Sequence, residues 1–320
     1  MINIHGGRVV VRTPATSANL GPGFDSLGLA LGLHDEVEVE ITSTPGLVVE
    51  VTGEGEGELD TGEGHLVVRA LRAAFDAFAV RQPAGIRLVC RNRIPHGRGL
   101  GSSSSAICAG VLAARALAYP ESVGAAGVRE DSGGVLSDGY ALTLATEIEG
   151  HPDNVAPCIA GGLTIAWMEQ AGVPRMVKLV PHAGIRPVAV VPRNRLSTEV
   201  ARGLLPKDVP HADASANAGR AALLVAALTG RPERELLLAA TEDRLHQDYR
   251  APAMPDTADL VKRLRGAGVP AVVSGAGPTV LAFSTADTQD LIAPEVGTDW
   301  HIQPLDVETH GARVAFPETR

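Results

Sequence analysis

A glycine-serine stretch in the first third of the chain constrains the fold more than any other feature. Residues 95–106 read PHGRGLGSSSSA, with glycine at three of the five positions from 97 to 101. Directly behind it, apolar residues recur at helical spacing from Ile107 to Ala118 and form one apolar stripe. The sequence therefore predicts a tight loop that leads straight into an amphipathic helix.

This loop has the chemistry of an anion site. Glycines let the backbone approach a ligand without Cβ obstruction, and the start of a helix offers unpaired N–H groups and a positive dipole end. Serine hydroxyls there can donate to phosphate oxygens or bind Mg²⁺. The alternative is a purely structural loop in which Ser102 or Ser103 caps the helix, which stabilises a helix by about 1 kcal/mol and needs no ligand.

Two common phosphate loops are excluded. The chain has no G-x-x-x-x-G-K-[ST] segment and no Gly-Lys dipeptide, and it also lacks G-x-G-x-x-G. If the loop binds phosphate, it belongs to a fold other than those that carry these two motifs.

The flanking segments favour an α+β fold in two domains, because strand and helix patterns alternate along the chain. Val37, Val39 and Ile41 alternate with glutamates as in a strand with one apolar face, and 47–51 follows a turn, which predicts an antiparallel pair. Further strands are expected at 9–11, 86–90, 160–168, 186–191, 271–274 and 279–283, and helices at 66–79, 138–149, 213–229, 232–246 and 257–267. Residues 119–137 read as a loop, and we expect domains at 1–159 and 160–320.

Composition narrows the class of protein. The chain has 320 residues, a formal net charge of −9 and only ten aromatic residues, which argues against nucleic acid or an anionic membrane as partner. The chain has an odd number of cysteines, Cys90, Cys108 and Cys158, and none of them forms a C-x-x-C pair, which favours a reducing compartment. The longest apolar run that we find, 221–228, is too short to span a bilayer, so we expect a cytoplasmic protein.

Three motifs in order resemble those of one superfamily. The 95–106 loop is similar to the P-x-x-x-G-L-G-S-S-A-A phosphate loop of the GHMP kinases, which is accompanied here by PATSANLGPGFD at 14–25 and SGAGPT at 274–279. Within that superfamily, the segments PATSANLGPGFDSLGLAL and DNVAP are most similar to the homoserine kinases. Members of that family transfer the γ-phosphate of ATP to the side-chain hydroxyl of L-homoserine in threonine biosynthesis.

The resemblance implies a two-domain α+β architecture. Residues 1–159 would form a ribosomal protein S5-like ATP-binding domain, and residues 160–320 a ferredoxin-like substrate-binding domain. The implied ATP contacts are Pro95, Gly97, Arg98, Gly99, Leu100, Gly101, Ser102, Ser103, Ser104 and Ser105. Mg²⁺ would be held by Ser103 and Glu147, with Glu149 as a nearby competitor; either glutamate alone would read as a solvated helix-end carboxylate.

The implied amino-acid site spans both halves of the chain. The resemblance implies that the carboxylate of the substrate binds to Arg202 and Arg250, because the planar fork of arginine matches a carboxylate. A single arginine, by contrast, is more often a surface charge. The other implied substrate contacts are Asn19, Asp25, His151, Thr198 and Gly275, and the implied catalytic residues are Asn19, Asp25, Asp153 and Asn154.

Two departures from the family pattern are visible. The segment around Asp153 lacks the Ser-Gly of the P-S-G-x-D-N pattern, so Asp153 is either a base or a group that orients His151. Where the family often has Asn before a Leu-Val helix, this chain has His65.

Alternatives to homoserine phosphorylation remain. They are another GHMP small-molecule kinase of mevalonate or sugar type, and a non-catalytic nucleotide or amino-acid sensor on the same fold. The sequence leaves open whether the chain forms a homodimer.

Overall fold

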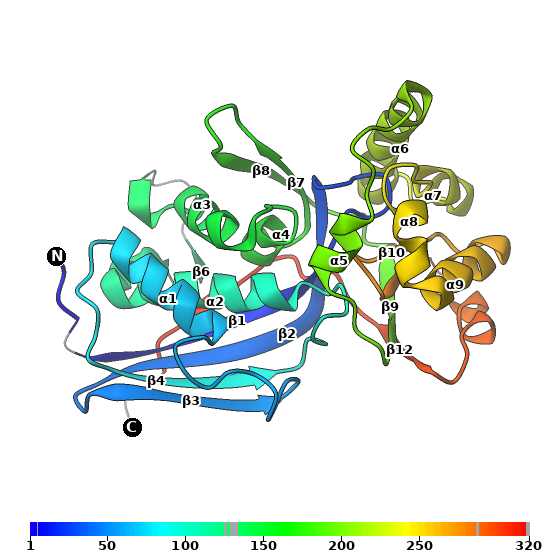
Figure 1. Ribbon diagram of the computed structural model, residues 1–320. Coiled ribbons are helices and arrows are strands. Elements are labelled where there is room, and N and C mark those ends of the chain that lie inside the picture. Colours follow the sequence, from blue (N-terminus) through cyan, green and yellow to red (C-terminus); the bar gives the residue numbers. More distant parts are fainter. Residues whose placement is uncertain (5, 125–126, 129–133, 286–287, 318–320) are drawn as a thin grey trace.

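The computed structural model describes the chain except for residues 5, 125–126, 129–133, 286–287 and 318–320. A seven-stranded sheet under helices forms one half, and a four-stranded sheet with its own helices forms the other (Figure 1). The glycine-serine loop lies where the two halves meet, because its carbonyls bond to both of them, as described below.

The large sheet is built around one long strand. Its strands are β1 (Gly7–Ala18), β2 (Leu27–Thr42), β3 (Gly46–Gly53), β4 (Gly85–Asn92), β7 (Leu163–Met168), β8 (Pro174–Leu179) and β13 (Arg313–Ala315). Their order is β13-β1-β2-β4-β3, and β7 and β8 branch from β2. The long β2 serves two partners on one edge, because 36–42 pairs with β4 and 27–29 pairs with β7.

The expected antiparallel pair of 37–41 with 47–51 is wrong. Strand β4 lies between β2 and β3, and β3 runs parallel to β4. A parallel pair needs a crossover connection, and helix α1 (Leu66–Ala77) lies between β3 and β4 in the chain and supplies it.

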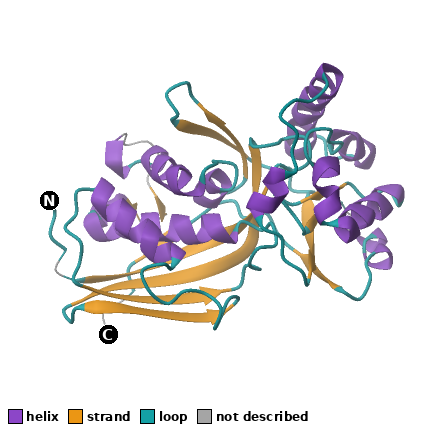
Figure 2. Cartoon of the chain, in the orientation of Figure 1, coloured by secondary structure: helices purple, strands orange, loops and turns teal. Residues whose placement is uncertain are grey.

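Helices cover one face of this sheet (Figure 2). They are α1, α2 (Ser102–Ala118), α3 (Asp138–Glu149) and α4 (Val155–Ala160). The apolar stripe predicted for the helix behind the loop faces this core, with Ile107 and Val111 of α2 fully buried, and Leu71 and Phe75 of the predicted helix α1 are fully buried as well. The predicted helix at 138–149 is confirmed as α3.

The second half has a ferredoxin-like sheet. Its strands β9 (Arg186–Pro192), β10 (Ala271–Val273), β11 (Val280–Ser284) and β12 (Trp300–Pro304) are antiparallel, in the order β10-β11-β9-β12. Its helices are α5 (Thr198–Gly203), α6 (His211–Thr229), α7 (Arg234–Ala240), α8 (Gln247–Arg250) and α9 (Pro255–Gly266). Alternate residues of β9 enter different cores: Val188 packs in the cluster with Leu260 of α9, and Ala189 in the cluster with Leu224 of α6. The α+β fold class is confirmed.

The expected boundary at 159/160 does not coincide with the edge of the large sheet, because β7, β8 and β13 lie beyond it in the chain. One apolar core also joins the halves, since Leu20 and Leu29 share a cluster with Leu224 and Leu281. Of the expected loop at 119–137, residues 125–126 and 129–133 lie outside the described residues.

Short elements complete the described chain. These are β5 (Val123–Gly124), β6 (Gly127–Val128) and 3₁₀ turns at Pro120–Ser122, Gly134–Leu136, Ala251–Ala253, Gln289–Leu291 and Ala293–Glu295. Cys90, Cys108 and Cys158 are free thiols and are buried. Among the described residues, no helix combines the length and apolar character needed to cross a bilayer.

Candidate functional site

The glycine-serine loop ends at a helix start that no side chain caps. Gly101 is the N-cap residue with φ +70°, and Gly97 and Gly99 also have positive φ. A Cβ on Gly101 would collide with Thr16 Oγ1, which accounts for glycine at this position. The alternative role of Ser102 or Ser103 as N-cap is therefore not the one that the fold uses.

The loop turns its carbonyl groups toward the protein. Five successive carbonyl oxygens each accept a hydrogen bond: Gly97 from Leu196 N, Arg98 from Thr279 N, Gly99 from Ser274 Oγ, Leu100 from Thr16 N and Gly101 from Ser105 N. The donors come from both halves of the molecule. The N–H groups of the first helical turn of α2 have no intrahelical acceptor and remain available to a ligand.

A cavity of about 330 Å³ opens beside this loop, between the two halves. Of the residues predicted for the site, it is lined by Asn19, Gly97, Arg98, Gly99, Gly101, Ser102, Ser103, His151, Asp153, Asn154, Thr198, Arg202, Arg250 and Gly275. Three segments far apart in sequence thus meet at one place, as the resemblance implied.

Six predicted residues do not line this cavity: Asp25, Pro95, Leu100, Ser104, Ser105 and Glu147. Leu100 is fully buried in the core that joins the halves. Asp25 lies behind two lining residues: its carboxylate accepts hydrogen bonds from Arg202, and its backbone N–H donates to Asn19 Oδ1.

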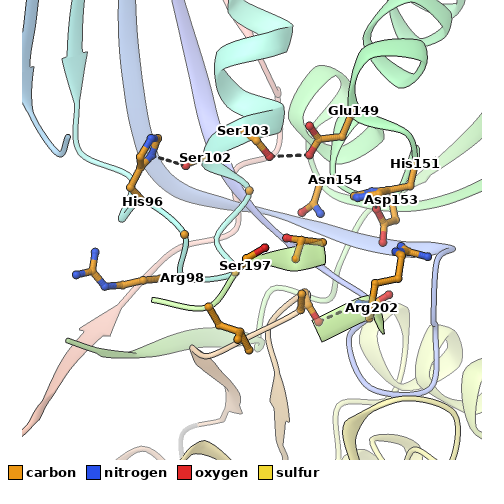
Figure 3. A pocket seen from close by; sticks show the side chains of 18 of the residues that line it. His96, Arg98, Ser102, Ser103, Glu149, His151, Asp153, Asn154, Ser197 and Arg202 are labelled. Atoms are coloured by element: carbon orange, nitrogen blue, oxygen red, sulfur yellow. Dashed lines mark hydrogen bonds and ion pairs between the residues drawn. The ribbon is translucent and has the colours of Figure 1, made fainter. Parts of the chain in front are cut away.

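The carboxylate beside the loop belongs to Glu149. Its Oε1 accepts hydrogen bonds of 2.7 Å from the hydroxyls of both Ser103 and Ser104, whereas Glu147 is exposed (Figure 3). The predicted position of the acidic ligand is therefore two residues from the carboxylate that faces the loop. Helical spacing could have found it, because Leu142, Ala145 and Glu149 follow i, i+3, i+7 along the buried side of α3.

Two guanidinium groups lie over the Phe24 ring at the second-half side of the cavity. Arg202 and Arg250 lie 6.0 Å and 5.5 Å from the Phe24 ring centroid. Arg250 is 1% exposed, and its Nε has no hydrogen-bond partner among the residues that the structure describes. Burial and the neighbouring charge of Arg202 lower the pKa of Arg250. An anion placed between the two groups would relieve both effects.

Polar groups of the 151–154 turn lie near Arg202 (Figure 3). His151 Nδ1 is 2.6 Å from Asp153 Oδ1. Burial opposes protonation of His151, but the hydrogen bond and charge of Asp153 outweigh it and leave the pKa of His151 raised. Asn154 Oδ1 accepts from Thr16 Oγ1, and Asn19 Nδ2 donates to Gly275 O, so both amides are held in place.

A second cavity of about 270 Å³ adjoins the first and shares Leu66, His96 and Ser102 with it. Asp35 and His65 line it as well. Asp35 is 6% exposed, and burial raises its pKa to about 6 although the amides of residues 93 and 94 and Ser105 Oγ donate to it.

Sequence reasoning missed some residues of the first cavity. His96 lies inside the loop motif, and its Nδ1 forms a hydrogen bond of 2.8 Å with Ser102 Oγ. Its place in the motif could therefore have identified it as a site residue. Leu66, Leu196, Ser197 and Ala276 also line the cavity. Only the pairing of the two halves brings Leu196 and Ser197 to the loop, and their sequence carries no such signal.

Comparison with known proteins gives matches along the whole chain. Residues 65–162 match the family model of the GHMP kinases N terminal domain, and residues 224–302 match that of the GHMP kinases C terminal domain. A homoserine kinase of Streptomyces coelicolor is 58% identical over 96% of this chain and 94% of its own length. A homoserine kinase of Clavibacter michiganensis is 52% identical over 97% and 94%.

Solved structures agree with these matches. The crystal structure of homoserine kinase from Cytophaga hutchinsonii superposes with a TM-score of 0.79 at 27% identity, covering 96% of this chain and 97% of that one. Mevalonate kinase from L. major, solved in complex with R-mevalonate, has a TM-score of 0.69 at 16% identity over 94% and 96%, which is a likeness of fold alone.

Proposed function

The chain belongs to the homoserine kinase family of the GHMP kinases, and from this premise we propose that it transfers the γ-phosphoryl group of ATP to the side-chain hydroxyl of L-homoserine, in threonine biosynthesis. The observation that carries the proposal is one cavity that joins an uncapped helix start with free amides to a pair of guanidinium groups. The first feature suits phosphates and the second suits a carboxylate.

The phosphates of ATP lie against the loop. The amides of the first turn of α2 and the positive end of its dipole hold negative charge there, and Ser102 and Ser103 add hydroxyl donors. In phosphoryl transfer most of the catalysis comes from alignment and from stabilisation of the charge that develops on the transferring group. The rigid carbonyl contacts of the loop keep its amides preorganised for this task.

Ser103 and Glu149 fit Mg²⁺. Both supply hard oxygen donors, and Mg²⁺ is usually held by one or two carboxylates together with substrate phosphates rather than by a complete protein cage. The ion would neutralise charge on the β- and γ-phosphates. We place the carboxylate ligand at Glu149 instead of Glu147, because Glu149 contacts the loop.

The nucleoside end of ATP occupies the second cavity. This cavity adjoins the phosphate loop through His96 and Ser102 and has apolar walls that include Leu66 and Val67. Residues 1–159 thereby supply the nucleotide site, and both halves of the chain contribute to the amino-acid site.

The amino acid is bound by both of the charged groups on its α-carbon. Its carboxylate lies between Arg202 and Arg250, with Thr198 beside them in the cavity wall. The ammonium group of the substrate forms an ion pair with Asp25. Before the substrate binds, the Asp25 carboxylate is hydrogen-bonded to Arg202. Substrate binding thus exchanges one ion pair for two.

The hydroxyl faces the loop, near Asp153 and Asn154. Asp153 is 2% exposed, and its Oδ1 is engaged by His151, so Oδ2 is the oxygen that can accept a hydrogen bond from the substrate hydroxyl. Asn19 bonds to Gly275 O and to the Asp25 amide, so it fixes the geometry of the motif at 14–25.

Steady-state formation of ADP tests the proposal. We expect turnover with L-homoserine and much less with 4-hydroxybutyrate, which lacks the ammonium group, or with 3-amino-1-propanol, which lacks the carboxylate. Turnover with mevalonate or a sugar but not with homoserine would overturn the substrate assignment. Binding of nucleotide without turnover on any of these alcohols would indicate a sensor instead.

A further inference from the structure

A buried histidine contacts the more buried of the two site arginines. His246 is 0% exposed and does not line the first cavity, whereas Arg250 does. His246 is the N-cap residue of α8, four positions before Arg250, a spacing that places two side chains on the same side of a helix. His246 Nδ1 is 3.1 Å from Arg250 Nη1. The histidine therefore stands behind the arginine and does not face the cavity itself.

The two hydrogen bonds of the His246 ring fix its tautomer. Nε2 is 2.9 Å from Gly21 O, and a carbonyl oxygen only accepts hydrogen bonds, so Nε2 carries a proton. A guanidinium group only donates, so Nδ1 is the acceptor of the hydrogen bond from Arg250. Only the neutral ring, with its proton on Nε2, satisfies both partners.

The charges around the ring favour the same neutral form. Burial lowers the pKa of His246, the charge of Asp243 opposes this shift and the charge of Arg250 adds to it. Asp243 Oδ2 lies 3.6 Å from His246 Nε2 and also accepts from the backbone N–H groups of His246 and Gln247, which fixes the turn before α8. His246 Nδ1 therefore remains an acceptor at neutral pH.

Few other contacts orient the Arg250 side chain. Its Nη1 also lies 3.3 Å from Gly275 O, and its Nε has no partner among the described residues. The Phe24 ring lies under this guanidinium and stacks on His246, with the two ring centroids 5.3 Å apart. Because Gly21 lies in the 14–25 motif and α8 lies in the second half, the His246 ring links Arg250 to both halves of the molecule.

We propose that His246 is a positioning residue for substrate recognition. Its Nδ1 holds Arg250 in place for the substrate carboxylate, and its Nε2–H anchors this arginine to the 14–25 motif. The inference rests on the proposed function, because it takes Arg250 as a partner of that carboxylate. A side chain that is fixed in advance loses less conformational freedom when substrate binds. His246 therefore acts on the KM for homoserine, and no step of phosphoryl transfer passes through it.

Two substitutions separate the two ring nitrogens. His246→Gln offers an amide N–H near the place of Nε2 but no acceptor near Nδ1, and we expect the KM for homoserine to rise about tenfold, as loss of one hydrogen bond to a charged group would cause. His246→Asn places an oxygen near Nδ1, and its KM should stay within about threefold of the wild type. The kcat and the KM for ATP should change less than about twofold in both variants. His301→Gln, on the exposed part of β12, is the control.

A double-mutant cycle shows whether His246 acts through Arg250. In the Arg250→Ala background, His246→Gln should cause no further rise in the KM for homoserine, whereas in the Arg202→Ala background the rise of about tenfold should remain. A role in packing alone would give the same loss in every background. An unchanged KM in His246→Gln, equal losses in the Gln and Asn variants, or a full further loss on top of Arg250→Ala would overturn the proposal.

Failure of the proposed function would look different, because the wild-type chain would then show no homoserine-dependent turnover. If the His246 variants do not fold, ¹⁵N NMR of the ring in the wild type still decides. We expect a proton on Nε2 and none on Nδ1, and a shift of the Nδ1 signal in Arg250→Ala. A proton on Nδ1, or a Nδ1 signal that Arg250→Ala leaves unshifted, would contradict the positioning role.

Discussion

The guanidinium of Arg202 donates two hydrogen bonds to the carboxylate of Asp25, one to each oxygen, at 2.8 Å and 3.0 Å. The two residues come from different halves of the molecule, and Asp25 adopts a left-handed backbone conformation, with φ +54°. A carboxylate of the chain therefore occupies the fork that we assign to the carboxylate of the substrate. Before homoserine enters, Arg202 is thus paired with Asp25, whereas Arg250 Nε has no hydrogen-bond partner within the described part of the chain.

The two arginines provide the first prediction. Arg202→Ala and Arg250→Ala should each raise the KM for homoserine by about 100-fold, because loss of a charged hydrogen-bond partner from a carboxylate costs about 1.5–3 kcal/mol. The KM for ATP should change less than threefold. Arg244→Ala, which removes an exposed arginine paired with Asp213, is the matched control. Equal losses for both substrates would contradict the carboxylate assignment.

The two glutamates at the end of α3 provide the second prediction. Glu149→Gln should lower kcat by at least about 100-fold and raise the Mg²⁺ concentration needed for half-maximal rate, because it removes the charged ligand beside Ser103. Glu147→Gln, on the exposed side of the same helix, should behave like the wild type. The reverse result for the two variants would return the ligand to Glu147.

The pKa of His151 gives a third prediction, measured by NMR titration of its ring. The midpoint should lie above 6.5, and it should fall in Asp153→Asn, which removes the charge that outweighs burial. Because the folded pKa is raised, the pair stabilises the protein below pH 6.5, and this contribution disappears as the pH rises through the folded pKa. A midpoint below 6.5 in the wild type would refute the assigned pairing.

Asp35 gives a fourth prediction, with the same sign of pH dependence but at lower pH. Its folded pKa of about 6 lies above its ordinary value of 3.8, so between these values the folded state binds a proton that the unfolded state has lost. The free energy of unfolding should therefore fall as the pH rises from about 4 to about 6. Asp35→Asn should remove this decline and be more stable at pH 7 by up to roughly 3 kcal/mol.

Urea denaturation at several pH values measures this difference. Asp259→Asn, on the exposed face of α9, is the control and should show no such trend. A wild-type stability that rises between pH 4 and pH 6, with no gain at pH 7 in Asp35→Asn, would show that the Asp35 carboxylate is not penalised by burial.

The sequence predicted most elements because their signals are local. The stripe from Ile107 to Val111 and the alternation from Val37 to Ile41 depend only on neighbouring residues, and both segments have the expected structure. The place of β4 between β2 and β3 was missed, since strand order depends on contacts between distant segments. For the same reason, the sequence could not indicate that the His65 ring has no hydrogen-bond partner among the described residues, because this depends on every group packed around it.

The position of the acidic ligand shows a different limit of prediction from sequence. Both glutamates at the end of α3 satisfy the chemistry, and only the rotation of the helix decides which one faces Ser103. The motifs themselves were more informative, because glycines at 99 and 101 are required by close contacts with Ser274 and Thr16 in this fold.

A crystal structure with ADP, Mg²⁺ and L-homoserine bound tests the central claim most directly. The account predicts the β-phosphate within hydrogen-bonding distance of the amides of residues 102–104, and the homoserine carboxylate between Arg202 and Arg250. It also predicts that the substrate hydroxyl points toward the phosphate. A nucleotide bound elsewhere, with the loop amides turned away from its phosphates, would contradict it.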